Sequence, residues 1–228
     1  MVTGVLVALD YSDLAKAESM AARLAEVVTG FKVGLELLTA VGPSAVERIA
    51  SLGKPVFADA KLHDIPTTVE RAGANLRDAG ARWVTAHAGG GQEMLAAAVG
   101  SMGDNGGILA VTILTSFDDD TSLSVGFVDG VRGQVARMAA LAGAAGAEGV
   151  VCSALEVDTV RRVEPRLKVV TPGIRLAGDD SDDQARVVTP LMALAAGADY
   201  MVIGRSITAS NDPVRTANEI RKSLDRSG

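Results

Sequence analysis

The sequence predicts an α/β fold, a (β/α)₈ TIM barrel in which residues 1–228 form a single domain. Short runs rich in Val and Ile alternate eight times with Ala-rich stretches of helical periodicity, which favours parallel strands joined by helices. A length of 228 residues suits one barrel, and no Pro- or Ser-rich linker divides the chain. A doubly wound open sheet is the alternative, weakened because no G-x-G-x-x-G motif follows the first run.

Each strand is predicted from a short β-rich run between helical patterns. The eight predicted strands are residues 4–10, 31–37, 55–61, 82–88, 108–114, 149–154, 167–173 and 200–206. Between them apolar residues recur at three- and four-residue spacing, as in 14–28, 43–52 and 131–146, which predicts amphipathic helices. Several helices are expected to stop at a glycine just before the next strand, namely at Gly53, Gly80, Gly146 and Gly197.

The composition limits the classes of partner. The net charge is −6, and no basic run is present, so we expect no nucleic-acid partner, although local Arg and Lys can still hold a phosphate. The single cysteine, Cys152, cannot form an internal disulfide and is expected in the core, which suits a reducing cytoplasm. No signal peptide or membrane-spanning run is evident. We therefore expect a cytoplasmic protein without membrane contact.

Polar residues gather at the carboxyl ends of the predicted strands. In a barrel these ends share one rim, where active sites are built. Residues far apart in the chain are therefore expected to meet in one pocket: Asp10, Lys32, Asp59, Lys61, Asp64, His87, Thr112, Thr115, Pro172, Gly173, Arg175, Gly204 and Arg205.

The third strand, "FADAKLHDIP" (57–66), carries an unusual set of charges. Side chains alternate along a strand, so Asp59 and Lys61 face one side, toward the barrel mouth, with alanines on the other. Lys61 has an acid on either side in the sequence, Asp59 before it and Asp64 after it. These acids favour the charged form of Lys61. An ammonium held in this way can stabilise a developing anion and then protonate it. The alternative interpretation is a structural ion pair.

The last two strands indicate a phosphate site. "VIGRSI" (202–207) places Gly204 where backbone can approach a ligand, followed by Arg205 and a helix start, and "TPGIR" (171–175) adds Arg175. Barrels often bind phosphate at the loops after these strands. A turn is the alternative for either motif alone. The polar segment 176–190 is long enough for a lid, in which the amide of Gln184 could reach over a ligand.

No metal site is predicted. His63 and His87 are not spaced as a zinc pair, and "HAGGG" (87–91) favours a strand-to-helix turn over a phosphate loop.

These motifs together resemble a known family. "DAKLHDIPTTV" (59–69), with "FKVG" (31–34) upstream and "VTPGIR…DQ…VIGRSI" downstream, is similar to orotidine 5′-phosphate decarboxylases of the bacterial single-function type, in order over nearly the whole chain. The resemblance implies loss of CO₂ from C6 of orotidine 5′-phosphate to give UMP, the last step of de novo pyrimidine nucleotide synthesis. It also implies that no metal or organic cofactor is needed.

The resemblance assigns a role to each matching residue. Lys61 stabilises and protonates C6, Asp59 lies near the departing carboxylate, and Lys32 and Asp64 complete the charged network. Asp10 and Lys32 contact the ribose hydroxyls, and Thr115 and Gln184 the pyrimidine. Arg175, Gly204 and Arg205 hold the phosphate. The substrate contacts also include the segment Asp64, Ile65, Pro66 and Thr68, of which Asp64 and Thr68 come from the neighbouring subunit of a homodimer with shared active sites.

Two other readings remain open. A Mg²⁺-dependent sugar-phosphate decarboxylase or aldolase, such as ketogulonate-phosphate decarboxylase or hexulose-phosphate synthase, shares the D-x-K-x-x-D pattern, but Lys32 and "HDIPTT" (63–68) favour the orotidine enzyme. A catalytically silent phosphate-binding barrel is expected to lose part of the charged set, and none is lost here.

Overall fold

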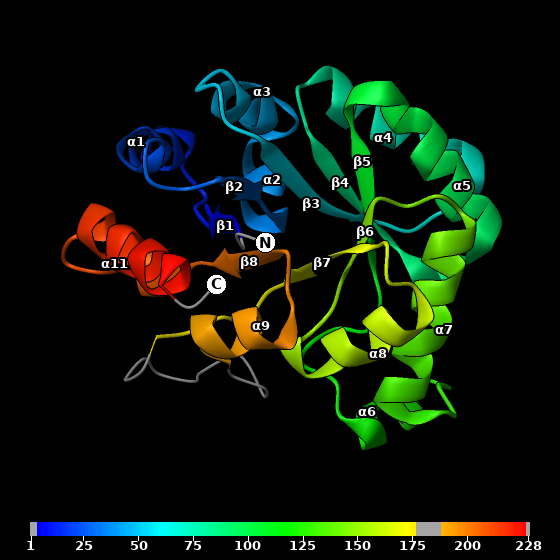
Figure 1. Cartoon of the computed structure of the whole chain (residues 1–228). Helices are drawn as coiled ribbons and strands as arrows, with labels where there is room; N and C mark the ends of the chain where they lie inside the picture. Colours follow the sequence, from blue (N-terminus) through cyan, green and yellow to red (C-terminus); the bar gives the residue numbers. More distant parts are fainter. Residues whose placement is uncertain (1–3, 177–187, 227–228) are drawn as a thin grey trace.

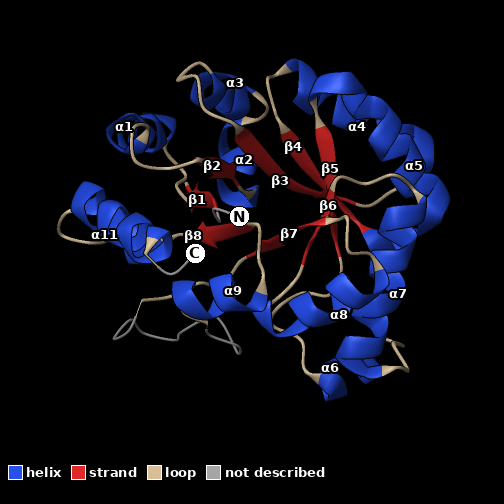
Figure 2. Ribbon diagram, viewed as in Figure 1, coloured by secondary structure: helices blue, strands red, loops and turns tan. Residues whose placement is uncertain are grey.

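Eight parallel strands form a closed barrel in the order β1 to β8, and helices surround it (Figures 1 and 2). The computed structural model describes residues 4–176 and 188–226. The strands are β1 (Gly4–Ala8), β2 (Gly30–Val33), β3 (Val56–Leu62), β4 (Trp83–His87), β5 (Gly107–Val111), β6 (Gly149–Val151), β7 (Lys168–Thr171) and β8 (Tyr200–Ile203). The predicted (β/α)₈ barrel is confirmed, and the open sheet is excluded because β8 pairs with β1.

The helices follow the strands along the chain. They are α1 (Leu14–Leu24), α2 (Leu35–Val41), α3 (Ser44–Ala50), α4 (Pro66–Asp78), α5 (Gly91–Met102), α6 (Asp119–Ser124), α7 (Gly130–Ala144), α8 (Val157–Val163), α9 (Pro190–Ala196), α10 (Arg205–Thr208) and α11 (Pro213–Asp225). Three short 3₁₀ turns accompany them: η1 (Ala88–Gly90), η2 (Gly103–Asn105) and η3 (Ala154–Glu156). The predicted turn at 87–91 is therefore confirmed as η1.

Glycine ends the helices as predicted. Gly53, Gly80, Gly146 and Gly197 all have positive φ, a conformation that side chains with a Cβ disfavour. At Gly197, the left-handed residue after α9, the backbone N–H donates to the carbonyls of Ala193 and Leu194.

The predicted second strand, 31–37, is wrong in its second half. Strand β2 ends at Val33 and α2 begins at Leu35, with Gly34 in extended backbone at the N-cap position. The last strand likewise ends at Ile203, because Gly204 is the residue before α10. Apolar residues continue across both junctions, so hydrophobicity alone does not mark where the strand stops.

Two apolar layers hold the barrel together. The outer layer lies between strands and helices and includes the fully buried Cys152. The inner layer fills the barrel and consists of Leu6, Ala8, Phe57, Trp83, Leu109, Val111, Val151, Val170 and Val202. Because side chains alternate along each strand, the inward-facing rows continue from these apolar residues to the carboxyl-terminal rim.

Trp83 closes the amino-terminal end of the barrel. Its indole N–H donates to Glu148 Oε1 at 3.0 Å, and its ring lies 5.1 Å from that of Tyr200. Arg82 binds both oxygens of Glu148, at 2.7 and 2.9 Å, and places its guanidinium 4.8 Å from the centre of the Trp83 ring. A paired, stacked guanidinium at this end supports the fold and leaves the opposite rim for chemistry.

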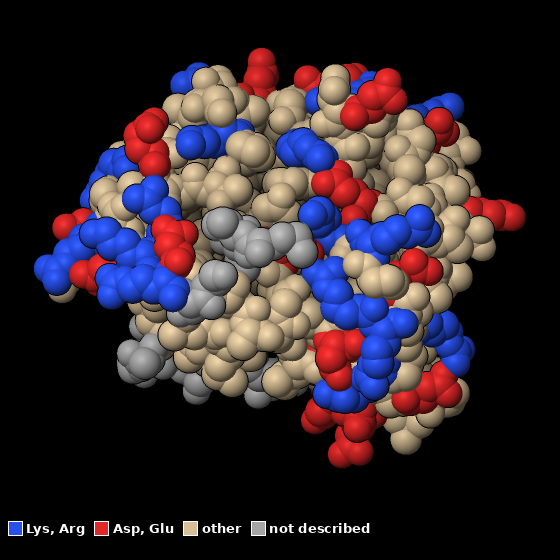
Figure 3. All heavy atoms as spheres, viewed as in Figure 1, with Lys and Arg blue, Asp and Glu red and all other residues tan. Residues whose placement is uncertain are grey.

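Acidic and basic side chains are interspersed over the surface shown in Figure 3. Ion pairs such as Arg161 with Asp199 and Arg82 with Glu148 show that several of the basic side chains are paired with acidic ones. Of the helices within residues 4–176 and 188–226, none is both long and apolar enough to cross a membrane.

Candidate active site

A cavity of about 560 Å³ opens at the carboxyl-terminal rim. Its floor is the top of the inner apolar layer, and its walls are the polar residues that follow. From β1 the inward row runs through Leu6 and Ala8 to Asp10, just past the end of the strand, and in β3 it runs from Phe57 to Asp59. The lining residues are Ala8, Asp10, Lys32, Glu36, Phe57, Asp59, Lys61, Val111, Ile113, Leu114, Thr115, Val151, Pro172, Gly173, Arg175, Val202, Gly204 and Arg205.

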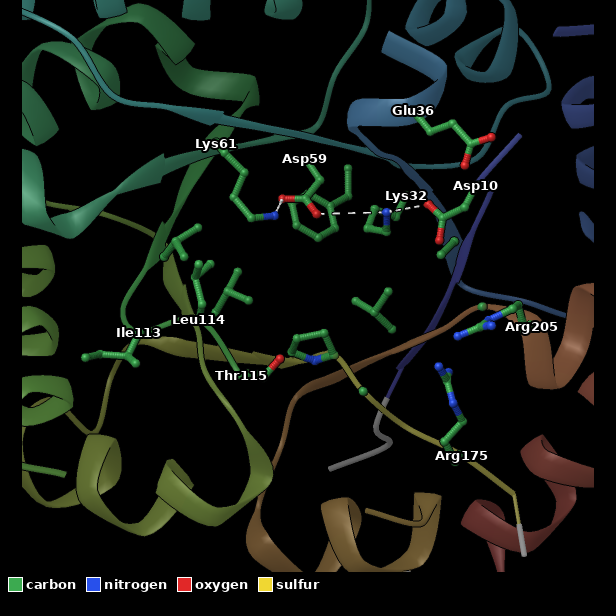
Figure 4. Close-up of a pocket in the computed structure, with 18 residues that line it drawn as sticks. Asp10, Lys32, Glu36, Asp59, Lys61, Ile113, Leu114, Thr115, Arg175 and Arg205 are labelled. Carbon is green, nitrogen blue, oxygen red and sulfur yellow. Dashed lines mark hydrogen bonds and ion pairs between the residues drawn. The ribbon is translucent and has the colours of Figure 1, made fainter. Parts of the chain in front are cut away.

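Charges of alternating sign cross one wall of this cavity (Figure 4). The Lys61 ammonium donates to Asp59 Oδ1, and Lys32 Nζ lies 3.9 Å from Asp59 Oδ2. Lys32 also donates to Asp10 Oδ1 at 2.9 Å. The side chains of Lys32 and Asp59 are only 12% and 14% exposed, so their charges act in an environment that screens them less than bulk water does.

Glycine at position 34 makes room for this network. A Cβ there would lie 2.4 Å from Lys32 Nζ and 3.1 Å from Asp10 Oδ1. The residue between β2 and α2 therefore has to lack a side chain if Lys32 is to reach Asp10.

The backbone at Lys61 is unusual. Its φ is +53°, the only positive value among the described residues other than glycine. The pairing of β3 with β4 also shifts here, from Ala58 opposite Val84 to Leu62 opposite Ala86. Residues held in the left-handed region are uncommon and cluster at functional sites, because surrounding contacts have to offset the strain.

Cationic side chains mark the other side of the cavity. Figure 4 shows Arg175 and Arg205 on one side of the cavity, away from Lys61. Arg205 is the first residue of α10, and Gly204 before it also lines the cavity. Two guanidinium groups beside a glycine backbone suit a dianionic phosphate. Both guanidinium groups and Lys61 line the same cavity, whose volume of about 560 Å³ is enough for a small-molecule ligand.

Comparison with known proteins gives the family. The model for the "Orotidine 5′-phosphate decarboxylase / HUMPS family" matches residues 3–220. The chain is 46% identical to orotidine 5′-phosphate decarboxylase of Paramagnetospirillum magneticum (strain AMB-1), over 98% of this chain and 99% of that protein. Orotidine 5′-phosphate decarboxylase of Anaeromyxobacter sp. (strain K) is 47% identical over 96% of this chain and 97% of that protein. The crystal structure of orotidine 5′-phosphate decarboxylase from Lactobacillus acidophilus superposes with a TM-score of 0.85 at 32% sequence identity. The superposition covers 98% of this chain and 99% of that one.

The chain belongs to the orotidine 5′-phosphate decarboxylase / HUMPS family. The resemblance stated from the sequence motifs is thereby confirmed.

Most of the predicted site residues of this family member line the cavity. Asp10, Lys32, Asp59, Lys61, Thr115, Arg175, Gly204 and Arg205 all do so. Gln184 lies outside the described residues, and its predicted contact stays a prediction.

The segment after β3 leaves the cavity of its own chain. Asp64 is exposed, and its carboxylate accepts the Ile65 N–H at 2.7 Å. Ile65 is 68% exposed, Pro66 is the first residue of α4, and Thr68 is exposed in its first turn. None of these four residues is among those that line the cavity. Within one chain, Lys61 is therefore not flanked by two acids, as the sequence suggests. Its ammonium pairs with Asp59, and Asp64 does not line the same cavity.

The sequence motifs do not indicate two polar residues at or beneath the cavity wall, Glu36 and Thr85. Glu36 lines the cavity from the first turn of α2 and accepts a hydrogen bond from the Ser12 hydroxyl at 2.7 Å. The sequence does not indicate this position, because the apolar run 31–37 favours a strand that extends over Glu36, whereas Glu36 lies in α2. Thr85 is buried beneath Asp59 and Lys61 and bonds to both. Strand alternation from His87 could have found it, since residues 85 and 87 share a face.

His87 ends β4 beside this network. Burial lowers the pKa of His87, and the nearby His63 and Lys61 lower it further, while Asp59 opposes them. The His63 and His87 rings lie 5.4 Å apart. In the part of the chain that the structure describes, no group of three or more His, Cys, Asp or Glu side chains is placed to hold a metal ion.

Proposed function

We propose that this protein, with residues 1–228 as one catalytic domain, decarboxylates orotidine 5′-phosphate to UMP in pyrimidine nucleotide synthesis. The observation that carries the proposal is the cavity itself. An ammonium paired with a carboxylate stands on one side, and two guanidinium groups stand on the other. A pyrimidine nucleotide has a matching layout, with its reacting carbon and its phosphate at opposite ends. The relatives named above carry the same activity in their names.

Lys61 supplies the chemistry at C6. When the bond from C6 to the carboxylate breaks, CO₂ leaves and the electron pair stays on C6, where the ring offers no good electron sink. The Lys61 ammonium stabilises this pair and then transfers a proton to C6, which leaves a neutral amine and UMP. Its pairing with Asp59 fixes the ammonium before the substrate arrives.

Asp59 and Lys32 shape the charge around the leaving group. A substrate carboxylate placed next to Asp59 is repelled by its like charge. The repulsion is relieved as the carboxylate becomes neutral CO₂, so the site favours the transition state over the ground state. Lys32, between Asp59 and Asp10, keeps the two protein carboxylates compensated. Asp10 can accept hydrogen bonds from the ribose hydroxyls, and Lys32 can donate to their oxygens.

The remaining contacts position the nucleotide. Arg175, Gly204 and Arg205 bind the phosphate, and Thr115 contacts the pyrimidine, with Gln184 as the predicted second contact. Binding energy from the phosphate is remote from C6, and it contributes to rate by holding the base against Lys61.

We also propose a homodimer with shared active sites. Asp64 is exposed and does not line the cavity of its own chain, and the adjacent Ile65 is an apolar side chain left 68% exposed. In a two-fold dimer each chain can present this segment, including Pro66 and Thr68, to the site of the other. Asp64 then completes the charged network around the partner's ammonium. A reduced, buried Cys152 is consistent with a cytoplasmic location, where we place the reaction.

The test of the proposed function is turnover without metal. Purified protein is mixed with orotidine 5′-phosphate in the presence of EDTA, and loss of substrate absorbance and formation of UMP are followed. We expect full turnover, since the residues above supply every charge that the reaction needs. Turnover that appears only after Mg²⁺ is added contradicts the proposal and supports a Mg²⁺-dependent sugar-phosphate enzyme.

A further inference from the structure

The bulge in β3 leaves a backbone group without a strand partner. Between the paired positions Ala58/Val84 and Leu62/Ala86, β3 advances four residues while β4 advances two. The N–H of Lys61, in its left-handed conformation, therefore falls outside the regular ladder. A partly buried N–H without a partner is costly, so another acceptor has to replace the ladder carbonyl.

Thr85 provides that acceptor. The residue is fully buried in the middle of β4, and its Oγ1 accepts the Lys61 N–H at 2.8 Å. The same hydroxyl donates to Asp59 Oδ1 at 3.0 Å, the oxygen that also receives the Lys61 ammonium. A hydroxyl has one hydrogen, so accepting from the backbone and donating to the carboxylate uses it in one fixed orientation.

We propose that Thr85 is a positioning residue for the decarboxylation, holding the Lys61 backbone and the Asp59 carboxylate in one geometry. The inference rests on the proposed function. Thr85 is not among the residues that line the cavity, so it acts through Asp59 and Lys61 rather than by touching the substrate. Its hydroxyl ties the main chain of the proton donor to the side chain that orients the same donor.

This role predicts a specific pattern of kinetic damage. Without the hydroxyl, Asp59 can rotate about its side-chain bonds and Lys61 loses the acceptor that supports its φ of +53°. Displacement of a reacting group by about 1 Å can cost about 100-fold in rate. The phosphate and ribose contacts come from other strands and stay in place. The loss should therefore fall on kcat, while KM and the affinity for UMP stay near those of the unchanged protein.

The experiment compares three substitutions. Thr85→Val keeps the shape and removes the hydroxyl, and we expect a kcat about 100-fold lower with unchanged UMP affinity by calorimetry. Thr85→Ser restores the hydroxyl without the methyl, and we expect kcat within about tenfold of the unchanged protein. Thr171→Val is the matched control: Thr171 is also fully buried, and its hydroxyl has no hydrogen-bond partner among the described residues. It should leave kcat unchanged.

Each outcome separates this inference from the proposed function. If the unchanged protein does not turn over orotidine 5′-phosphate, the proposed function fails and this inference fails with it. If it does, and Thr85→Val retains its kcat, only the role of Thr85 is wrong. Should Thr85→Val not fold, Thr85→Ala is measured in its place against the same expectation. A folded Thr85→Ser protein as slow as the variant without a hydroxyl also overturns the role, because shape rather than hydrogen bonding would then matter.

Discussion

At the scale of single residues, Lys61 is the group on which the proposed chemistry depends most. We predict that Lys61→Ala lowers kcat by at least about 1,000-fold, because it removes both the charge opposite C6 and the proton donor. Steady-state turnover and circular dichroism on the same preparation check this. Lys222→Ala, the same change at an exposed position in α11, is the control and should have no effect. A folded Lys61→Ala protein with near-normal turnover would remove Lys61 from the mechanism.

His87 should make the stability of the fold depend on pH. Its pKa in the folded protein lies below the usual value of 6.5, mainly because of burial, with His63 and Lys61 adding to the shift. The unfolded chain therefore binds more protons than the folded one as the pH falls from about 6.5 toward the lowered pKa, and folding loses stability over that range. Above the unfolded value the contribution is fully present.

The measurement is urea unfolding of the unchanged protein and of His87→Gln at several pH values between 5.5 and 7.5, a range chosen on the order of one unit either side of the imidazole pKa. We expect the unchanged protein to lose more stability than the variant as the pH decreases. Parallel curves for the two proteins would show that His87 does not carry this dependence.

At the scale of elements, the junction between β2 and α2 controls the reach of Lys32. We predict that Gly34→Ala lowers kcat/KM by about tenfold or more, because the new Cβ meets Lys32 Nζ and forces it away from Asp10. The clash falls on the far end of a flexible side chain, so the melting temperature should change little. Gly100→Ala in α5 is the control, since a Cβ there meets nothing within 4 Å. A clear fall in the melting temperature of Gly34→Ala together with the loss of kcat/KM would point to general damage to the fold.

The elements also show where sequence reasoning reaches its limit. Alternating strands and helices, and the helix stops at Gly53, Gly80, Gly146 and Gly197, could be read directly, because local periodicity and glycine chemistry determine them. The helix α2 could not, because "LELL" (35–38) continues the apolar run of β2 without a break in hydrophobicity. The bulge of β3 depends on a contact with Thr85 in the next strand, which no local pattern reports.

At the scale of the whole molecule, the barrel topology explains how so much of the site could be predicted. Once the strands are ordered, their carboxyl ends must converge, so Asp10, Lys61 and Arg205 could be placed together from sequence. Asp64 could not be placed in the same way. It follows Lys61 by three residues but lies past the end of β3, where the chain turns outward into α4. The role that we propose for Asp64 depends on a second subunit.

Shared active sites predict complementation between two inactive proteins. We expect Lys61→Ala and Asp64→Ala each to be inactive alone, and activity to return when they are mixed under conditions of subunit exchange. In a mixed dimer one site collects both defects, while the other receives intact Lys61 and intact Asp64. Random exchange of equal amounts should restore about a quarter of the normal number of working sites.

Exchange has to be confirmed by mass for that result to be read. If mixed dimers form from two inactive proteins and no activity returns, Asp64 serves its own chain and the shared-site proposal is wrong. If no dimer is found at all and the protein is active, the proposal fails in the same way.

The position of Trp83 at the amino-terminal end of the barrel gives the protein an intrinsic fluorescent probe. Trp83 is the only tryptophan in the chain, and it packs in the inner layer with Phe57 and Val111, which also line the cavity. Its hydrogen bond to Glu148 and its ring contact with Tyr200 exist only when β4, β8 and the start of β6 have come together. Tryptophan emission therefore reports assembly of the barrel interior around Trp83, without any engineered label, and can time that event during refolding.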